Sequence, residues 1–121
     1  MRESAMALWV AVPVLVTSLS RRTYKDGKVV EDLNAYAQAT REVGAKNDIT
    51  VIDLNRISTA MLDKMTQAEA DKFDRVTQPK FDRTHLNAYG KKVFGRIVAD
   101  QLVRSQVELG PDVVGELVKA N

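Results

Sequence analysis

Two short runs of apolar, mostly β-branched residues constrain the fold of this chain more than any other feature. They span residues 10–17 and 49–54, and neither run alternates between apolar and polar positions. Such runs are typical of strands that are buried on both faces of a parallel sheet. Between them, residues 32–44 show helical periodicity. A strand, a helix and a strand in this order predict a right-handed βαβ unit with parallel strands.

The ends of these elements carry recognisable signals. Asp32 is expected to cap the N-terminus of the helix, and Gly44 is expected to stop it. Residues 18–28 are polar and predict a loop, with a turn at Asp26-Gly27. Pro13 cannot donate a hydrogen bond to a neighbouring strand, so it fits best near the start of the first strand or at a sheet edge.

The second half of the chain predicts mainly helices. Residues 57–65 predict one helix, and Thr66 with Glu69 three residues later forms a capping box for a second piece. Residues 76–84 are expected to be a loop, and residues 88–104 predict a long helix that Asn87 caps. A break at residues 110–111 leaves residues 105–121 as a C-terminal extension with a short helix, so the chain holds a single domain over residues 1–104.

Composition excludes several classes of function. The 121 residues carry a net charge of +2, which gives no argument for nucleic-acid binding. There is no cysteine, so disulfides, thiolate metal sites and cysteine catalysis are excluded. The aspartates between residues 53 and 74 lack the spacing of a calcium loop, and we expect neither a metal nor a cofactor. Only one histidine is present.

The N-terminal 20 residues have two interpretations. A charged start, an apolar run over residues 5–16 and small residues at 18 and 20 resemble a signal peptide. The alternating valines from Val10 to Val16 instead favour a strand, which we prefer, and the localisation stays open. The run is too short to cross a membrane.

The stretch with chemical potential is Asp82 to Asn87. An aspartate three residues before a histidine, both in a loop just ahead of a helix, can turn back and accept the Nδ1–H of that histidine. This contact would fix the tautomer of His85 and leave its Nε2 outward as a general base. By itself, an Asp-x-x-His pair is weak evidence, because solvated pairs of this kind are common.

Other segments of the chain, in a matching order and spacing, strengthen the interpretation of this motif. The order and spacing of several segments over residues 10–104 resemble those of the SGNH (GDSL-type) hydrolases, and most closely their rhamnogalacturonan acetylesterase-like branch. These segments are Pro13–Thr17, Arg21-Arg22, Asp26–Val30, Arg41–Val43, Val51–Leu54 and Asp82–Asn87. The resemblance implies an α/β fold of three layers (α/β/α, flavodoxin-like), of which this chain would hold the last two strands of a five-stranded parallel sheet flanked by helices.

The resemblance also implies a Ser-His-Asp esterase in which Asp82 and His85 are catalytic. The family's serine lies in a Gly-Asp-Ser block that this sequence lacks, and its glycine and asparagine blocks have no counterpart either. The chain would therefore be the C-terminal part of a carbohydrate (pectin-type) O-acetylesterase, inactive or weak alone. Ser18 or Ser20, just after the first strand, could serve as a surrogate nucleophile.

Partners follow from the same interpretation. Arg21 and Arg22 could contact an acetylated acidic polysaccharide through arginine–carboxylate pairs, although a solvated basic loop is the simpler interpretation. We expect neither a nucleic acid nor a membrane as partner. A two-stranded parallel sheet leaves open edges, so a catalytically silent, self-associating homo-oligomer is the alternative. A small polyanion-binding module built on residues 21–28 is a third, weaker possibility.

Overall fold

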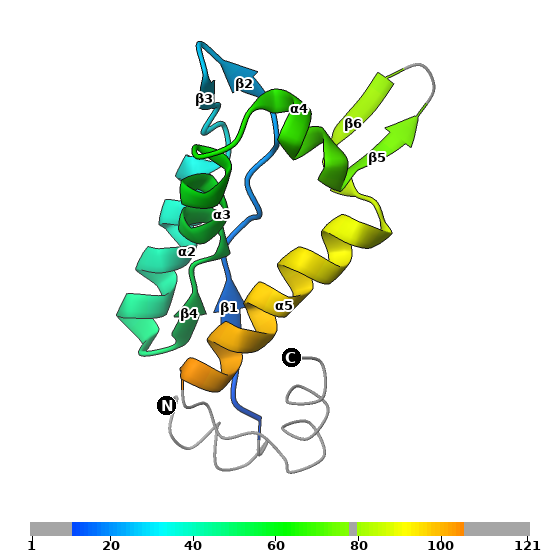
Figure 1. The fold of residues 1–121 in the computed structure, drawn as a ribbon. Helices are drawn as coiled ribbons and strands as arrows, with labels where there is room; N and C mark the ends of the chain where they lie inside the picture. The colour runs from blue at the N-terminus through cyan, green and yellow to red at the C-terminus, as the bar shows by residue number, and fades with distance from the viewer. Residues whose placement is uncertain (1–10, 78–79, 106–121) are drawn as a thin grey trace.

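A computed structural model describes residues 11–77 and 80–105 of the chain (Figure 1). This part is a mixed helix and strand fold with a short parallel sheet and helices packed beside it. Its elements in chain order are β1 (Val14–Val16), β2 (Tyr24–Lys25), β3 (Lys28–Val29), α2 (Asn34–Asn47), β4 (Thr50–Ile52), α3 (Leu54–Leu62), α4 (Gln67–Ala70), the 3₁₀ helix η1 (Asp71–Phe73), β5 (Asp74–Thr77), β6 (Lys80–Leu86) and α5 (Ala88–Arg104).

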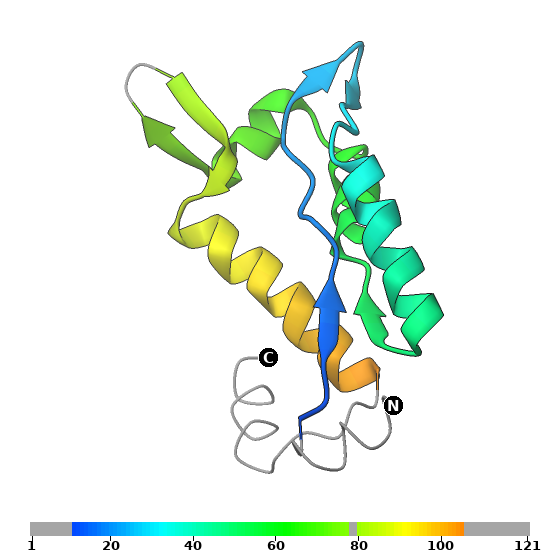
Figure 2. The same cartoon turned by 180° about the vertical axis from the view of Figure 1, so that it is seen from behind.

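The predicted strand–helix–strand unit is present. β1 pairs with β4 in parallel, with Leu15 opposite Val51, and α2 connects the two strands. Both strands are shorter than the apolar runs that predict them, and Pro13 lies immediately before β1. α2 packs against both strands and α5 packs against β4. In the view from behind, β1 has β4 on one side and no described strand on the other (Figure 2).

The two ends of α2 differ from the prediction. The helix starts at Asn34 with no side-chain cap, because Leu33 occupies the N-cap position, and the carboxylate of Asp32 accepts a hydrogen bond from Arg21 at 2.8 Å. Gly44 does not stop the helix. It is buried inside it, and the chain turns only at Asp48, which has a left-handed φ of 53°.

Two predicted loops contain antiparallel hairpins. β2 and β3 pair around Asp26 and Gly27, whose φ angles of 52° and 78° fit the two-residue turn that such hairpins favour. Residues 76–84, expected to be a loop, lie mostly in the β5–β6 hairpin. The candidate residues Asp82 and His85 therefore belong to strand β6, not to a loop.

Side-chain caps account for the helix starts in the second half. The carboxylate of Asp53 accepts from the N–H of Arg56, so α3 begins at Leu54, three residues before the predicted start. The capping box of Thr66 and Glu69 is confirmed. α5 has the predicted bounds, and the Asn87 side chain accepts from the N–H of Gly90.

The apolar core joins the first hairpin, α3, the α4–η1 segment and α5. Its buried members are Val29, Leu62, Ala70, Phe73 and Phe94. The ring of Phe73 meets that of Phe94 edge-on at 5.1 Å and stacks on Tyr89 at 5.5 Å. Tyr89 in the first turn of α5 remains 57% exposed although its ring stacks on that of Phe73. Residues 106–121 and 1–10, and with them nearly all of the C-terminal extension and the first half of the possible signal segment, lie outside the described residues.

Two glycines allow a matched test of the packing. A Cβ on Gly44 would fall on the Cγ2 atom of Val51, whereas a Cβ on Gly95 in α5 would meet nothing within 4 Å. We expect Gly44→Ala to lower the free energy of unfolding by about 1–3 kcal/mol, because overpacking forces α2 away from β4. Gly95→Ala should raise it by about 0.5–1 kcal/mol through helix propensity. Urea denaturation measures both, and equal effects would contradict the packing of α2 on β4.

Candidate functional site

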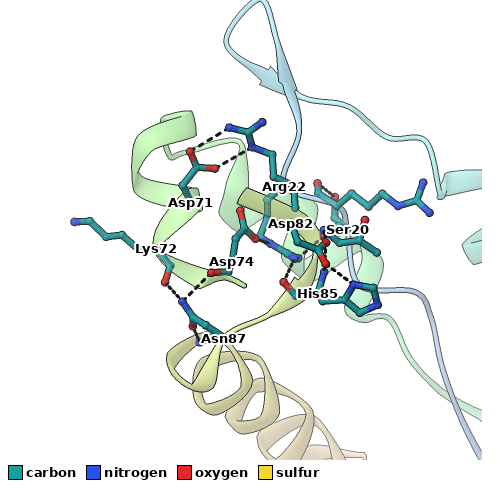
Figure 3. A network of polar contacts seen from close by, with 12 residues as sticks. Ser20, Arg22, Asp71, Lys72, Asp74, Asp82, His85 and Asn87 are labelled. Carbon is teal, nitrogen blue, oxygen red and sulfur yellow. Dashed lines mark hydrogen bonds and ion pairs between the residues drawn. The ribbon is translucent and has the colours of Figure 1, made fainter. Parts of the chain in front are cut away.

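The Asp82–His85 contact is formed in the structure. The Nδ1 atom of His85 lies 2.8 Å from the Oδ2 atom of Asp82 (Figure 3). The other carboxylate oxygen of Asp82 accepts hydrogen bonds from the backbone N–H groups of Thr84 and His85, at 3.0 and 3.1 Å. The aspartate is therefore fixed by three hydrogen bonds within its own strand.

An irregularity in the hairpin explains how two residues of a strand can meet at this spacing. Side chains three apart in a regular strand point to opposite faces. Here Asp82 pairs with Arg75, and Leu86 pairs with Asp74. Residues 83–85 of β6 therefore have no partner residue in β5 and lie opposite the peptide bond between residues 74 and 75. The strand bulges at this point, and bulges of this kind redirect side chains. The bulge brings the imidazole of His85 back onto Asp82.

Electrostatics define the state of the pair. The side-chain hydrogen bond from His85, together with the two backbone N–H groups, lowers the pKa of Asp82 to about 2. An ionised carboxylate can only accept, so Nδ1 carries the proton and Nε2 is left as the basic nitrogen. The imidazole is 68% exposed, and within the described residues Nε2 makes no hydrogen bond. This arrangement leaves Nε2 accessible to a further group that could donate a hydrogen bond to it.

Arg22 binds the backbone of the strand that carries Asp82 and His85. Its guanidinium forms a fully buried ion pair with Asp74 and also donates to the carbonyl oxygens of Ser20 and His85, each at 3.2 Å. Burial raises the pKa of the Asp74 carboxyl above its usual range, against the opposing effect of Arg22. An arginine with no exposed surface does not contact a polymer in this structure. In this structure the guanidinium of Arg22 thus holds Asp74 and two backbone carbonyls, and its expected role in substrate binding stays a prediction.

A second, partly exposed arginine pairs next to this buried pair. Arg83 binds both carboxylate oxygens of Asp71, at 3.0 and 3.2 Å. The side-chain amide of Gln67 donates to Asp71 and to the carbonyl of Arg22, both at 2.8 Å. Sequence reasoning missed these residues, and the only available signal was that charged residues cluster on both sides of the candidate pair.

The serines and Arg21 are placed as follows. Ser20 is buried, its hydroxyl donates to the carbonyl of Arg21, and its N–H donates to the Ser58 hydroxyl. Ser18 is partly buried, and in the described part of the chain neither serine hydroxyl bonds to His85. Arg21 remains half-exposed and pairs with Asp32. Arg22 thus brings the backbone of Ser20 close to His85, but the hydroxyl of Ser20 is turned to its own loop.

Another polar cluster closes the carboxyl ends of β1 and β4. The Asp53 carboxylate binds the guanidinium of Arg41 through both oxygens and accepts from the hydroxyl of Thr17. Burial raises the pKa of Asp53, but the bonds from Arg41, Thr17 and the Arg56 N–H together lower it below its usual value. A hollow of about 360 Å³ beside it is lined by both acidic and basic side chains. The sequence interpretation of Asp53 as part of a strand motif did not predict this cluster.

Beside His85 lies a second hollow, of about 380 Å³. Its lining residues are Arg75, His85, Leu86, Asn87, Ala88 and Lys91. Across residues 11–77 and 80–105, no group of three or more histidine, aspartate or glutamate side chains is placed to hold a metal ion. No helix in the same ranges is long and apolar enough to span a bilayer.

Comparison with known proteins gave no match to a protein-family model, to a curated protein or to a solved structure.

The low pKa of Asp82 makes the pair testable. A carboxyl whose folded pKa is depressed adds stability above its unfolded value, here 3.8, and loses that contribution as the pH falls through about 2. We expect the ¹³Cγ resonance of Asp82 to titrate near 2 in the native chain and closer to 3.8 in His85→Ala, because the largest cause of the shift is removed. Lys92→Gln is the control and should leave the midpoint in place. The same midpoint in His85→Ala would contradict the hydrogen bond.

Proposed function

We propose that this chain supplies the histidine and aspartate of a Ser-His-Asp acyl-transfer site in a carbohydrate O-acetylesterase of the SGNH type. The observation that carries the proposal is the 2.8 Å contact between His85 Nδ1 and Asp82 Oδ2, with the imidazole otherwise exposed. In a triad, this contact fixes the tautomer and stabilises the imidazolium that forms during the reaction.

The surrounding fold supports the proposal. A parallel β1–α2–β4 unit precedes the pair, and the long helix α5 follows it directly, capped by Asn87. We propose that these two strands are the last of a larger parallel sheet in a three-layer arrangement. The substrate would be an acetylated polysaccharide or a small ester.

The mechanism assigns one role to each residue. His85 Nε2 would take the proton of a serine hydroxyl as that oxygen attacks the acetyl carbonyl, and would pass it to the sugar oxygen that leaves as a free hydroxyl. Nε2 would then take a proton from the water that attacks the acyl-serine, and would return it to the serine oxygen as acetate is released. The carboxylate of Asp82 would stabilise the positive charge of the imidazolium. A serine in a Gly-Asp-Ser block is absent from this sequence, so we propose that another polypeptide segment provides the nucleophile and the oxyanion-hole donors.

A chimeric chain tests this function. Residues 11–105 are joined to the segment of a characterised SGNH esterase that carries its serine, glycine and asparagine blocks, and acetate release from acetylated pectin is measured. We expect turnover that falls by roughly 10⁴ or more in His85→Ala and by roughly 10⁴ in Asp82→Asn.

The controls separate the triad from its surroundings. Lys92→Gln, Ser18→Ala and Ser20→Ala should leave the chimera active, because none of these side chains belongs to the proposed triad. The isolated chain should hydrolyse p-nitrophenyl acetate at the rate of His85→Ala. A folded chimera without activity, or one that His85→Ala leaves unchanged, would contradict the proposal.

The open edge of β1 favours self-association as a second candidate function. β1 is paired on one side only among the described strands, and Val16 within it and Val12 just before it are 45% and 53% exposed. Unpaired edges with apolar neighbours recruit further strands. A second copy of this chain could satisfy the edge in the absence of other segments.

Light scattering checks this candidate. At micromolar concentration we expect twice the mass of one chain, and we expect Val16→Lys to return the mass of one chain, since a charge at a strand edge opposes pairing. Tyr36→Lys, at an exposed apolar residue of α2, is the matched control and should remain dimeric. A monomeric native chain would exclude this candidate.

A further inference from the structure

The hollow beside His85 has an unbalanced charge. Three of its six lining side chains, those of Arg75, His85 and Lys91, carry or can acquire a positive charge, and none is acidic. They come from three elements, β5, β6 and the first turn of α5. We propose that this hollow is an oxyanion-binding subsite adjacent to His85.

Unlike the arginines that bind carboxylates, Arg75 and Lys91 have no side-chain partner among the described residues. Arg22, Arg41 and Arg83 each bind a carboxylate. In the part of the chain that the structure describes, neither Arg75 nor Lys91 forms an ion pair or a side-chain hydrogen bond. Both are exposed at the rim of the hollow, so their charges are available to a ligand.

The start of α5 adds to the positive potential. Asn87 occupies the N–H of Gly90 with its side chain, at 2.8 Å. The N–H groups of Ala88 and Tyr89 have no protein partner among the described residues, and the helix behind them has 17 residues. The first turn of a helix carries a partial positive charge that favours anions. Backbone and side chains therefore point to the same ligand chemistry.

The hollow beside Arg41 shows what a different charge pattern looks like. Its lining combines Arg41 and Arg56 with Glu31 and Asp63. A mixed lining of this kind gives an anion no net advantage, because each arginine has a carboxylate nearby. The hollow at His85 is the one of the two whose lining holds no acidic side chain.

The ligand class follows from these groups. Arginine binds carboxylates and phosphates in a bidentate manner. Lysine and the N–H groups of a helix N-terminus can donate further hydrogen bonds to either anion. If the proposed esterase function holds, the oxyanion would be a carboxylate of an acidic sugar next to the acetylated unit. The subsite would then select negatively charged substrates over neutral ones. Binding itself does not depend on turnover.

The single histidine provides the readout. The Hε1 resonance of His85 in the full chain is followed at fixed pH and ionic strength while galacturonate, neutral galactose or inorganic phosphate is added. We expect a saturable shift with galacturonate and none with galactose. Saturation with phosphate as well would assign a general oxyanion site, and saturation with galacturonate alone would assign a site that also contacts the sugar.

Two variants and a matched control locate the site. Arg75→Gln and Lys91→Gln should each weaken galacturonate binding roughly fivefold, in keeping with a partly exposed charge pair. Lys92→Gln removes the same charge one residue further along α5, outside the lining of the hollow, and should bind as the native chain does.

Three results would overturn the subsite: no saturable shift with either anion, the same shift with galactose, or equal losses in all three variants. These outcomes are separate from those of the esterase test. An active chimera without anion binding removes the subsite alone, and anion binding in an inactive chimera removes the esterase function alone.

Discussion

The buried ion pair between Arg22 and Asp74 is the interaction on which the candidate site depends. It joins the segment after β1 to the start of β5, and the remaining N–H groups of Arg22 hold the carbonyls of Ser20 and His85. Removing one partner of a fully buried pair typically costs about 3–5 kcal/mol, because the other charge is left without compensation. The bulge that carries His85 is thus linked through Arg22 to the segment after β1, while Leu86, the next residue, packs against the apolar core that includes Phe73 of η1.

The exposed pair is rigid even though it lies on a hairpin. Asn87, directly after β6, binds the carbonyls of Lys72 and Asp74 with its side-chain amide and caps α5 with its side-chain oxygen. Its own N–H donates to the carbonyl of Phe73. Both ends of the bulge are therefore fixed, one by Arg22 and the other by Asn87. A histidine held in this way keeps its orientation without being buried, which leaves Nε2 accessible to a partner group.

Local signals in the sequence predicted the elements that depend on local physics. The β1–α2–β4 order, the Thr66–Glu69 capping box, the bounds of α5 and the Asp82–His85 contact all follow from periodicity or from residues three apart. The β5–β6 hairpin did not, because its strands are polar and their pairing is fixed by a bulge and by the tertiary contacts of Arg22. The burial of Arg22 could not be predicted either, since Asp74 is 52 residues away. The sequence predicts Gly44 as the end of α2, whereas the structure places it inside the helix, where its missing side chain leaves room for Val51 of β4.

One added segment could both pair with the edge of β1 that no described strand covers and carry the nucleophile that the proposed triad requires. A further parallel strand on that edge would end at the same side of the sheet as β1, where Thr17 and the Ser18–Ser20 segment follow. Arg22 already joins the carbonyl of Ser20 to that of His85. A residue at the carboxyl end of the added strand would therefore arrive beside the segment that Arg22 links to the histidine. The strand that completes the sheet and the segment that delivers a serine toward Nε2 can be the same piece of polypeptide, so covering the edge and forming the triad become a single assembly step.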